Sequence, residues 1–70
     1  MKQYGDFVTL PGHNIDDGII KEAQLLLGVQ AKDIVGEGRF YYIVREVLLW
    51  DDEEQENVPV TYVGWKGVKE

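Results

Sequence analysis

The sequence contains no cysteine, no serine and only one histidine. Without cysteine, neither a disulfide nor a thiolate metal site can stabilise the fold, and a reducing compartment is the natural setting. Without serine and cysteine, the two commonest covalent nucleophiles are absent. The single histidine, His13, follows a Pro-Gly pair, and a polar turn residue explains it better than an isolated general base does. We therefore expect no enzyme activity and no catalytic residue.

Long apolar runs and an excess of basic residues are missing as well. The longest apolar runs, such as Val47–Trp50, are too short to span a bilayer, and residues 1–6 lack the apolar core of a signal peptide. We expect a cytoplasmic protein without a membrane segment. The Lys and Arg residues are scattered and the net charge is -6, so the sequence has no basic footprint for nucleic acid.

What the sequence does contain is a compact acidic cluster. Residues 51–56 are all Asp or Glu except for one Gln, whereas the remainder of the chain is nearly neutral. The cluster lacks the alternating ligands and central Gly of a calcium loop, so we expect no bound metal. A solvated hairpin loop that protects apolar strand ends from aggregation is one interpretation. Electrostatic contact with a basic partner is the other.

The most apolar segment, residues 39–50, predicts a long strand. It is rich in β-branched and aromatic residues and contains neither Gly nor Pro. Its alternating side chains form two apolar faces. One face comprises Phe40, Tyr42, Val44, Glu46, Leu48 and Trp50, and the other comprises Tyr41, Ile43, Arg45, Val47 and Leu49. A strand that is apolar on both sides needs cover on both sides.

Two further strands flank this segment in the sequence. Tyr4–Leu10 predicts a first strand, which Pro11-Gly12 ends as a turn pair. Residues 58–65 predict a return strand after the acidic loop. Proline cannot donate a hydrogen bond to a ladder, so Pro59 favours an edge position for this strand. We expect residues 67–70 to fray.

The segment 15–27 carries apolar residues at helical spacing. Asn14 is the expected N-cap, with Asp17 in a capping-box position, and Gly28 is the expected residue after the last turn. The apolar stripe consists of Ile15, Ile19, Ala23, Leu26 and Leu27, widened by Ile20. Gly18 weakens the helix by about 1 kcal/mol relative to Ala, which a close approach to the sheet would explain.

The segment from Gln30 to Val35 is ambiguous. Asp33–Val35 fits a short strand, and residues 36–38 fit a tight turn into the long strand. If both interpretations hold, the segment adds a short arm that pairs with the long strand as a first hairpin.

These elements predict one small α+β domain over residues 1–70. Its order is strand, helix and then a two- or three-stranded antiparallel sheet, with the one helix on one sheet face. The other face is left uncovered. Twelve extended residues reach roughly 40 Å, whereas a compact domain of this length is about 28 Å across. The long strand must therefore bend, or its hairpin must project beyond the body.

We interpret the chain as a small acidic, non-enzymatic protein-interaction module that binds a partner protein or a second copy of itself. Inhibitors, adaptors and accessory subunits, including those of phages, are analogous. The residues expected to contact the partner are Tyr42, Trp50, Asp51, Asp52, Glu53, Glu54, Tyr62 and Trp65. The alternative is a small-ligand or nucleotide sponge with an aromatic cleft at a subunit interface. Neither interpretation requires a cofactor.

Overall fold

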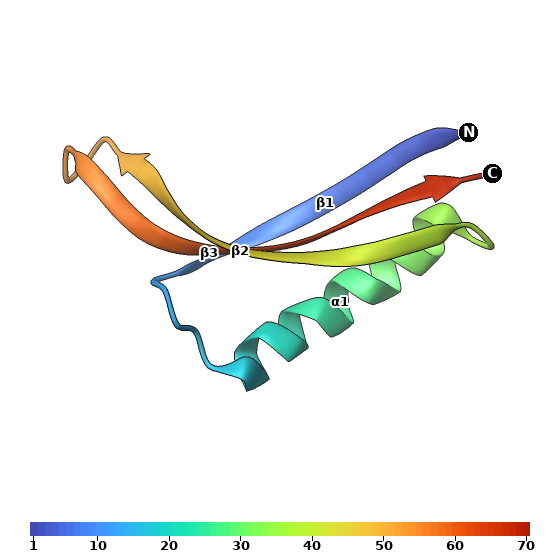
Figure 1. Cartoon of the computed structure of the whole chain (residues 1–70), viewed down its shortest axis with the longest axis horizontal. Helices are drawn as coiled ribbons and strands as arrows, with labels where there is room; N and C mark the ends of the chain where they lie inside the picture. The colour runs from blue at the N-terminus through green and yellow to red at the C-terminus, as the bar shows by residue number, and fades with distance from the viewer.

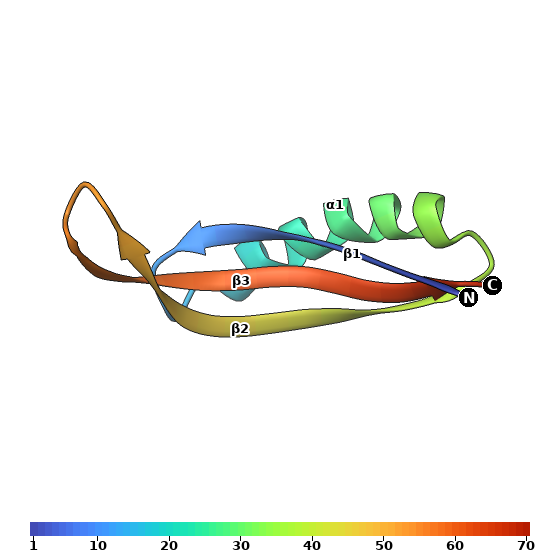
Figure 2. The same ribbon diagram turned by 90° about the horizontal axis from the view of Figure 1, so that it is seen from above.

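The computed structural model covers residues 1–70 and contains one helix and three strands. The elements are β1 (Lys2–Pro11), α1 (Asp17–Val35), β2 (Arg39–Asp51) and β3 (Glu56–Lys69). Both β1 and β2 pair antiparallel with β3, so β3 is the central strand. The helix packs on one face of this sheet, and no second layer covers the other face (Figures 1 and 2). The prediction of a small α+β domain is confirmed.

The strands extend beyond the segments that the sequence indicated. The long strand is confirmed as β2, and the first strand ends at the predicted Pro-Gly pair, where Gly12 has a φ of 92°. The prediction that Gly67 and Lys69 fray is wrong, and only Glu70 lies beyond the end of β3. Gly67 is buried between the two outer strands, and Lys69 pairs with Lys2. The start of β1 holds the end of β3, and the two chain termini lie together (Figure 1).

The prediction that Pro59 places its strand at an edge is wrong, because β3 lies between β1 and β2. The carbonyl of Pro59 accepts a hydrogen bond from the Gly12 N–H at 2.9 Å, so its nitrogen also points toward the β1 side. In a regular ladder, the N–H of residue 59 would donate to the Gly12 carbonyl, but proline has no N–H. The Gly12 carbonyl accepts a hydrogen bond from the Thr61 hydroxyl instead, at 2.8 Å. The central strand therefore tolerates this proline without an orphaned acceptor.

The helix begins two residues later than predicted. Asp16 is the N-cap, and its side chain accepts a hydrogen bond from the Gly18 N–H at 2.8 Å. Asn14 cannot cap the helix because its φ of 55° is left-handed, whereas an N-cap residue is extended. Gly18 therefore lies against the capping carboxylate, where a Cβ would be crowded, and not against the sheet.

The helix also ends later than predicted, so the short strand at Asp33–Val35 is wrong. Gly28 is buried inside the helix, and a Cβ at this position would collide with the Tyr42 hydroxyl. This glycine permits close packing of α1 on β2, which is the role that the sequence suggested for Gly18. The helix ends instead at Gly36, where φ is 59°. The residues that follow Gly36 form the predicted turn into the long strand.

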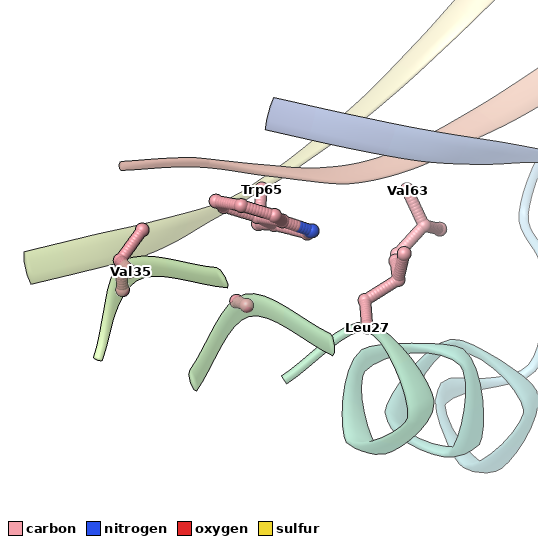
Figure 3. Close-up of a cluster of buried hydrophobic side chains, with 5 residues drawn as sticks. Leu27, Val35, Val63 and Trp65 are labelled. Carbon is pink, nitrogen blue, oxygen red and sulfur yellow. The ribbon is translucent and has the colours of Figure 1, made fainter. Parts of the chain in front are cut away.

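The core is a small cluster between α1 and β3 (Figure 3). Its buried apolar members are Leu27, Ala31, Val35, Val63 and Trp65. Leu26 was predicted to lie on the apolar stripe that faces the sheet, but its side chain is 72% exposed, so this assignment is wrong. The buried stripe of the helix passes through Leu27 and continues toward Val35, which turns Leu26 away from the sheet. Only nine of the 70 residues are buried, so one helix provides little cover.

The molecule is elongated, with extents of 43 × 25 × 15 Å. Its radius of gyration is 13.9 Å, whereas a compact chain of this length has about 11 Å. The difference arises from the β2–β3 hairpin, which bends and projects beyond α1 and β1 (Figure 1). The predicted bending or projection of this hairpin is thus confirmed.

Candidate interaction surface

The pairing register assigns every strand residue to one of the two sheet faces, because directly opposed residues point to the same side. Trp65 is buried under α1, so its neighbours Gly64 and Lys66 point away from the helix. We call the side away from the helix the open face. Its apolar side chains are Phe7, Tyr41, Ile43, Val47, Leu49, Val58, Val60, Tyr62 and Val68.

A stacked aromatic pair lies near the middle of the open face. The rings of Phe7 and Tyr62 are 4.7 Å apart and inclined by 18°. They come together above Gly64, where a Cβ would lie 2.9 Å from the Phe7 Cβ and from the Tyr62 ring. The glycine therefore allows two aromatic side chains from adjacent strands to pair. Phe7 is nevertheless 53% exposed, because nothing covers the pair.

Charges on the open face are separated along its length. The basic residues Arg39 and Lys66 lie toward the chain termini, and Arg45 lies midway along β2. The acidic residues Asp51 and Glu56 occupy the hairpin end of the same face. The face is therefore positive at one end and negative at the other. Such a distribution complements itself when two copies meet in opposite directions.

The helix-facing side of the hairpin is also uncovered near its turn, because α1 does not extend over that end (Figure 1). Val44, Leu48 and Trp50 lie on this side, and all three are exposed. Trp50 is 61% exposed, and its indole N–H donates to Asp52 Oδ1 at 2.9 Å. This bond holds a large apolar ring at the surface beside the acidic turn.

The acidic turn has its own hydrogen bonds. Asp51 Oδ1 accepts the backbone N–H of Glu53 at 2.9 Å and that of Glu54 at 3.4 Å. Gln55 has a φ of 53° and returns the chain into β3. The side chains of Glu53 and Glu54 make no hydrogen bond within the chain. The turn therefore presents two free carboxylates at the end of the hairpin.

The structure separates the residues that were predicted to contact a partner. Trp50 lies with the turn acids on the hairpin, and Tyr42 shares its side of the sheet, whereas Tyr62 lies on the open face. The prediction that Trp65 contacts a partner is wrong. It is only 1% exposed, and its indole N–H donates to Gln30 Oε1 at 3.2 Å.

Several surface residues were missed because the sequence did not show which strand face the helix covers. These residues are Phe7, Arg39, Tyr41, Arg45 and Lys66. The alternation along the long strand had already grouped Tyr41 with Arg45. Only the position of the helix identifies that group as the uncovered one.

Two hollows accompany these surfaces. One, of about 490 Å³, runs between α1 and β1 and is lined mainly by apolar side chains, among them Val8, Ile19 and Leu26. The other, of about 620 Å³, lies at the end of the sheet near the termini. Its lining combines aromatic residues with two cations and contains Tyr4, Arg39, Phe40, Tyr41 and Lys66.

The polar side chains that could suggest chemistry take part in structural hydrogen bonds. His13 Nε2 lies 2.9 Å from the Val47 carbonyl oxygen, so this nitrogen carries the proton and donates it. The pKa of Asp6 is lowered because its carboxylate accepts the Phe7 N–H and the Gln30 amide. No group of three or more His, Asp or Glu side chains lies close enough to hold a metal ion.

The helix is not long and apolar enough to cross a membrane. The chain matches no protein-family model, and no curated protein or solved structure is significantly similar to it.

Proposed function

We propose that this protein is a small, non-enzymatic interaction module that binds a partner protein or a second copy of itself. The contact would use the open face and the projecting hairpin. The observation that carries the proposal is the surface area of the subunit. A folded monomer of 8.0 kDa has an accessible surface of about 4,450 Å², whereas this subunit exposes 5433 Å².

The excess of roughly 1,000 Å² is comparable to the area of about 800 Å² that one partner buries in a standard interface. Much of the exposed surface is apolar. The exposed large apolar residues of β2 are Tyr41, Tyr42, Val44, Leu48, Leu49 and Trp50. Contiguous exposed apolar surface is typical of interaction sites. Burial of this strand by another molecule would offset the shortage of core in the isolated subunit.

The acidic turn would guide the approach of a partner. Its free carboxylates project at the end of the hairpin, where they can attract a basic surface before the apolar contacts form. Trp50, held beside the turn by Asp52, would then provide an aromatic anchor.

The hollow at the end of the sheet supports a second candidate function, the binding of a small ligand. Its volume of about 620 Å³ lies within the range of ligand pockets. The Tyr41 side chain, beside Arg39 and Lys66 on the open face, suits a flat anionic molecule. Thermal denaturation with a panel of nucleotides and aromatic acids tests this candidate. A rise in melting temperature that Lys66→Glu abolishes would favour it over the interaction module.

Two sedimentation experiments test the interaction module. The first uses the purified protein alone, and the second adds a candidate partner that was purified from the native host. We expect a self-complex in the first experiment or a complex of the two proteins in the second. The replacement of Leu49 by Glu should weaken it, because this residue lies on the open face of the hairpin. Leu25→Glu is the control, since Leu25 is also an exposed leucine (71%, against 46% for Leu49) but lies on α1. A monomer that forms no complex, or equal effects of both variants, would contradict the proposal.

A further inference from the structure

We infer that β2 pairs edge to edge, in antiparallel orientation, with β2 of a second copy, so that Arg39 of each subunit lies opposite Asp51 of the partner subunit. The two three-stranded sheets would join into one sheet of six strands. This inference rests on the proposed function and specifies its partner as a second copy of the chain.

The outer edge of β2 offers unpaired backbone groups along its whole length. Backbone groups of successive strand residues point to opposite sides. The Pro59 carbonyl faces β1, so the adjacent residue Val60 faces β2 and pairs with Val47. The residues whose N–H and C=O groups point outward are therefore Phe40, Tyr42, Val44, Glu46, Leu48 and Trp50. None of these groups has a hydrogen-bond partner within the chain.

The outer edge of β1 is protected, which leaves β2 as the open edge. By the same alternation, the Phe7 N–H points outward from β1, and the carboxylate of Asp6 accepts it at 2.8 Å. Pro11 occupies another outward position and has no N–H. The sequence of β2 contains neither Pro nor Gly nor Lys to discourage pairing. Edge strands without such protection pair readily with other strands.

The sequence of β2 complements itself in one register. Outward residues must face outward residues, so only registers that oppose even with even and odd with odd positions are regular. When Arg45 lies opposite Arg45 of the partner subunit, all thirteen residues of β2 are paired. Aromatic and aliphatic residues then face one another in the pairs Phe40 with Trp50, Tyr41 with Leu49, Tyr42 with Leu48 and Ile43 with Val47. Such cross-strand pairs stabilise sheets.

The same register brings opposite charges together at both ends of the joined strands. Arg39 lies opposite Asp51 of the partner subunit, twice by symmetry. Asp51 can accept this partner because the turn uses only its Oδ1 atom. If one strand slides by two residues relative to the other, Glu46 lies opposite Glu46 of the partner subunit in one direction. In the other direction, Arg39 lies opposite Leu49 of the partner subunit. Each alternative also leaves part of the strand unpaired.

Two elements of this register are unfavourable: the central pair of arginines, and Glu46 opposite Val44 of the partner subunit. Both Arg45 side chains lie on the exposed open face, where solvent screening weakens their repulsion. Two attractive Arg–Asp pairs and the backbone hydrogen bonds of the edges oppose it. A substitution that removes this charge should therefore strengthen the association slightly.

Disulfide trapping tests the register directly, because the chain has no cysteine of its own. Opposed residues that do not share backbone hydrogen bonds have Cα atoms about 4.5 Å apart, within the range of a disulfide. We expect Arg45→Cys to form a covalent dimer under mild oxidation. In this register Tyr41 lies roughly 26 Å from Tyr41 of the partner subunit, so the Tyr41→Cys variant alone should not cross-link. A mixture of the Tyr41→Cys and Leu49→Cys variants should cross-link, because these two positions lie opposite each other.

A proline scan tests the edge independently. Val44→Pro removes an outward N–H that β3 does not use, so we expect it to raise the dimer dissociation constant by about tenfold or more in sedimentation equilibrium. Thr9→Pro, at an outward position of β1, is the matched control and should leave the dimer intact. A dimer that survives Val44→Pro and resists cross-linking through Arg45→Cys would overturn the inference. A wild-type monomer that binds another protein would overturn the inference but leave the proposed function standing.

Discussion

Adjacent leucines on α1 provide the sharpest test of how the helix sits on the sheet. Successive helix residues are about 100° apart, so the structure buries Leu27 to 6% exposure and leaves Leu26 at 72%. Leu27→Ala should destabilise the fold by about 2–5 kcal/mol, through lost burial and a residual cavity. Leu26→Ala should change stability by less than about 0.5 kcal/mol.

The expected loss is large for this protein. At roughly 0.05–0.15 kcal/mol per residue, a chain of 70 residues has a total stability of about 3.5–10 kcal/mol. Even the smallest expected effect of Leu27→Ala should lower the melting temperature by about 8 °C. Urea denaturation followed by circular dichroism, at several protein concentrations, separates folding from association. Equal losses for the two variants, or a larger loss for Leu26→Ala, would show that the helix presents a different face to the sheet.

Three further changes test the local contacts. Gly28→Ala should lower the melting temperature although alanine favours helices, because the added Cβ meets the Tyr42 hydroxyl. In a Tyr42→Phe background, the same change should lower the melting temperature less or raise it. Thermal denaturation of the variants measures both effects. The pKa of Asp6 is lowered in the folded state, so its contribution is present above the unfolded pKa and is lost as the pH falls through the folded pKa. Asp6→Asn should therefore flatten the acid limb of a plot of melting temperature against pH, and an unchanged limb would exclude this contribution. The double variant Glu53→Gln/Glu54→Gln should leave the melting temperature nearly unchanged. Asp51→Ala should lower the stability by about 1 kcal/mol, because two turn N–H groups lose their acceptor. Equal effects of the two changes would contradict this account of the turn.

The elements with a strong local pattern could be predicted from the sequence. The β-branched and aromatic residues of 39–50 specify a strand whatever the remaining chain does, and Pro11-Gly12 ends the first strand by turn chemistry. The helix was placed correctly, but its ends were not. Gly28 resembles a C-terminal stop in the sequence, whereas its tertiary role is to admit the ring of Tyr42. Contacts from a distant strand decide between these two roles, and the local pattern carries no information about them.

The surface could be predicted in kind but not in its position. The alternation of β2 showed that one apolar face would remain bare, yet both faces were similar enough that either could have received the helix. The choice depends on Trp65 and Val63 of β3, which pack against Leu27 and its neighbours on α1. The same choice buries Trp65, which was predicted from the sequence to contact the partner. A large aromatic residue fits a core or an interface equally well until its strand neighbours are known.

The arrangement of the strands explains why the exposed surface is concentrated on β2. The central strand β3 has neighbours on both edges and α1 on one face, and it supplies all of the strand residues that are buried. β1 is an edge strand, but Asp6 and Pro11 protect its outer side. β2 is an edge strand and the more apolar of the two outer strands. It also forms half of a hairpin whose turn end α1 does not cover (Figure 1). Edge-to-edge pairing satisfies the outward backbone groups of β2 and brings its side chains against those of the added strand.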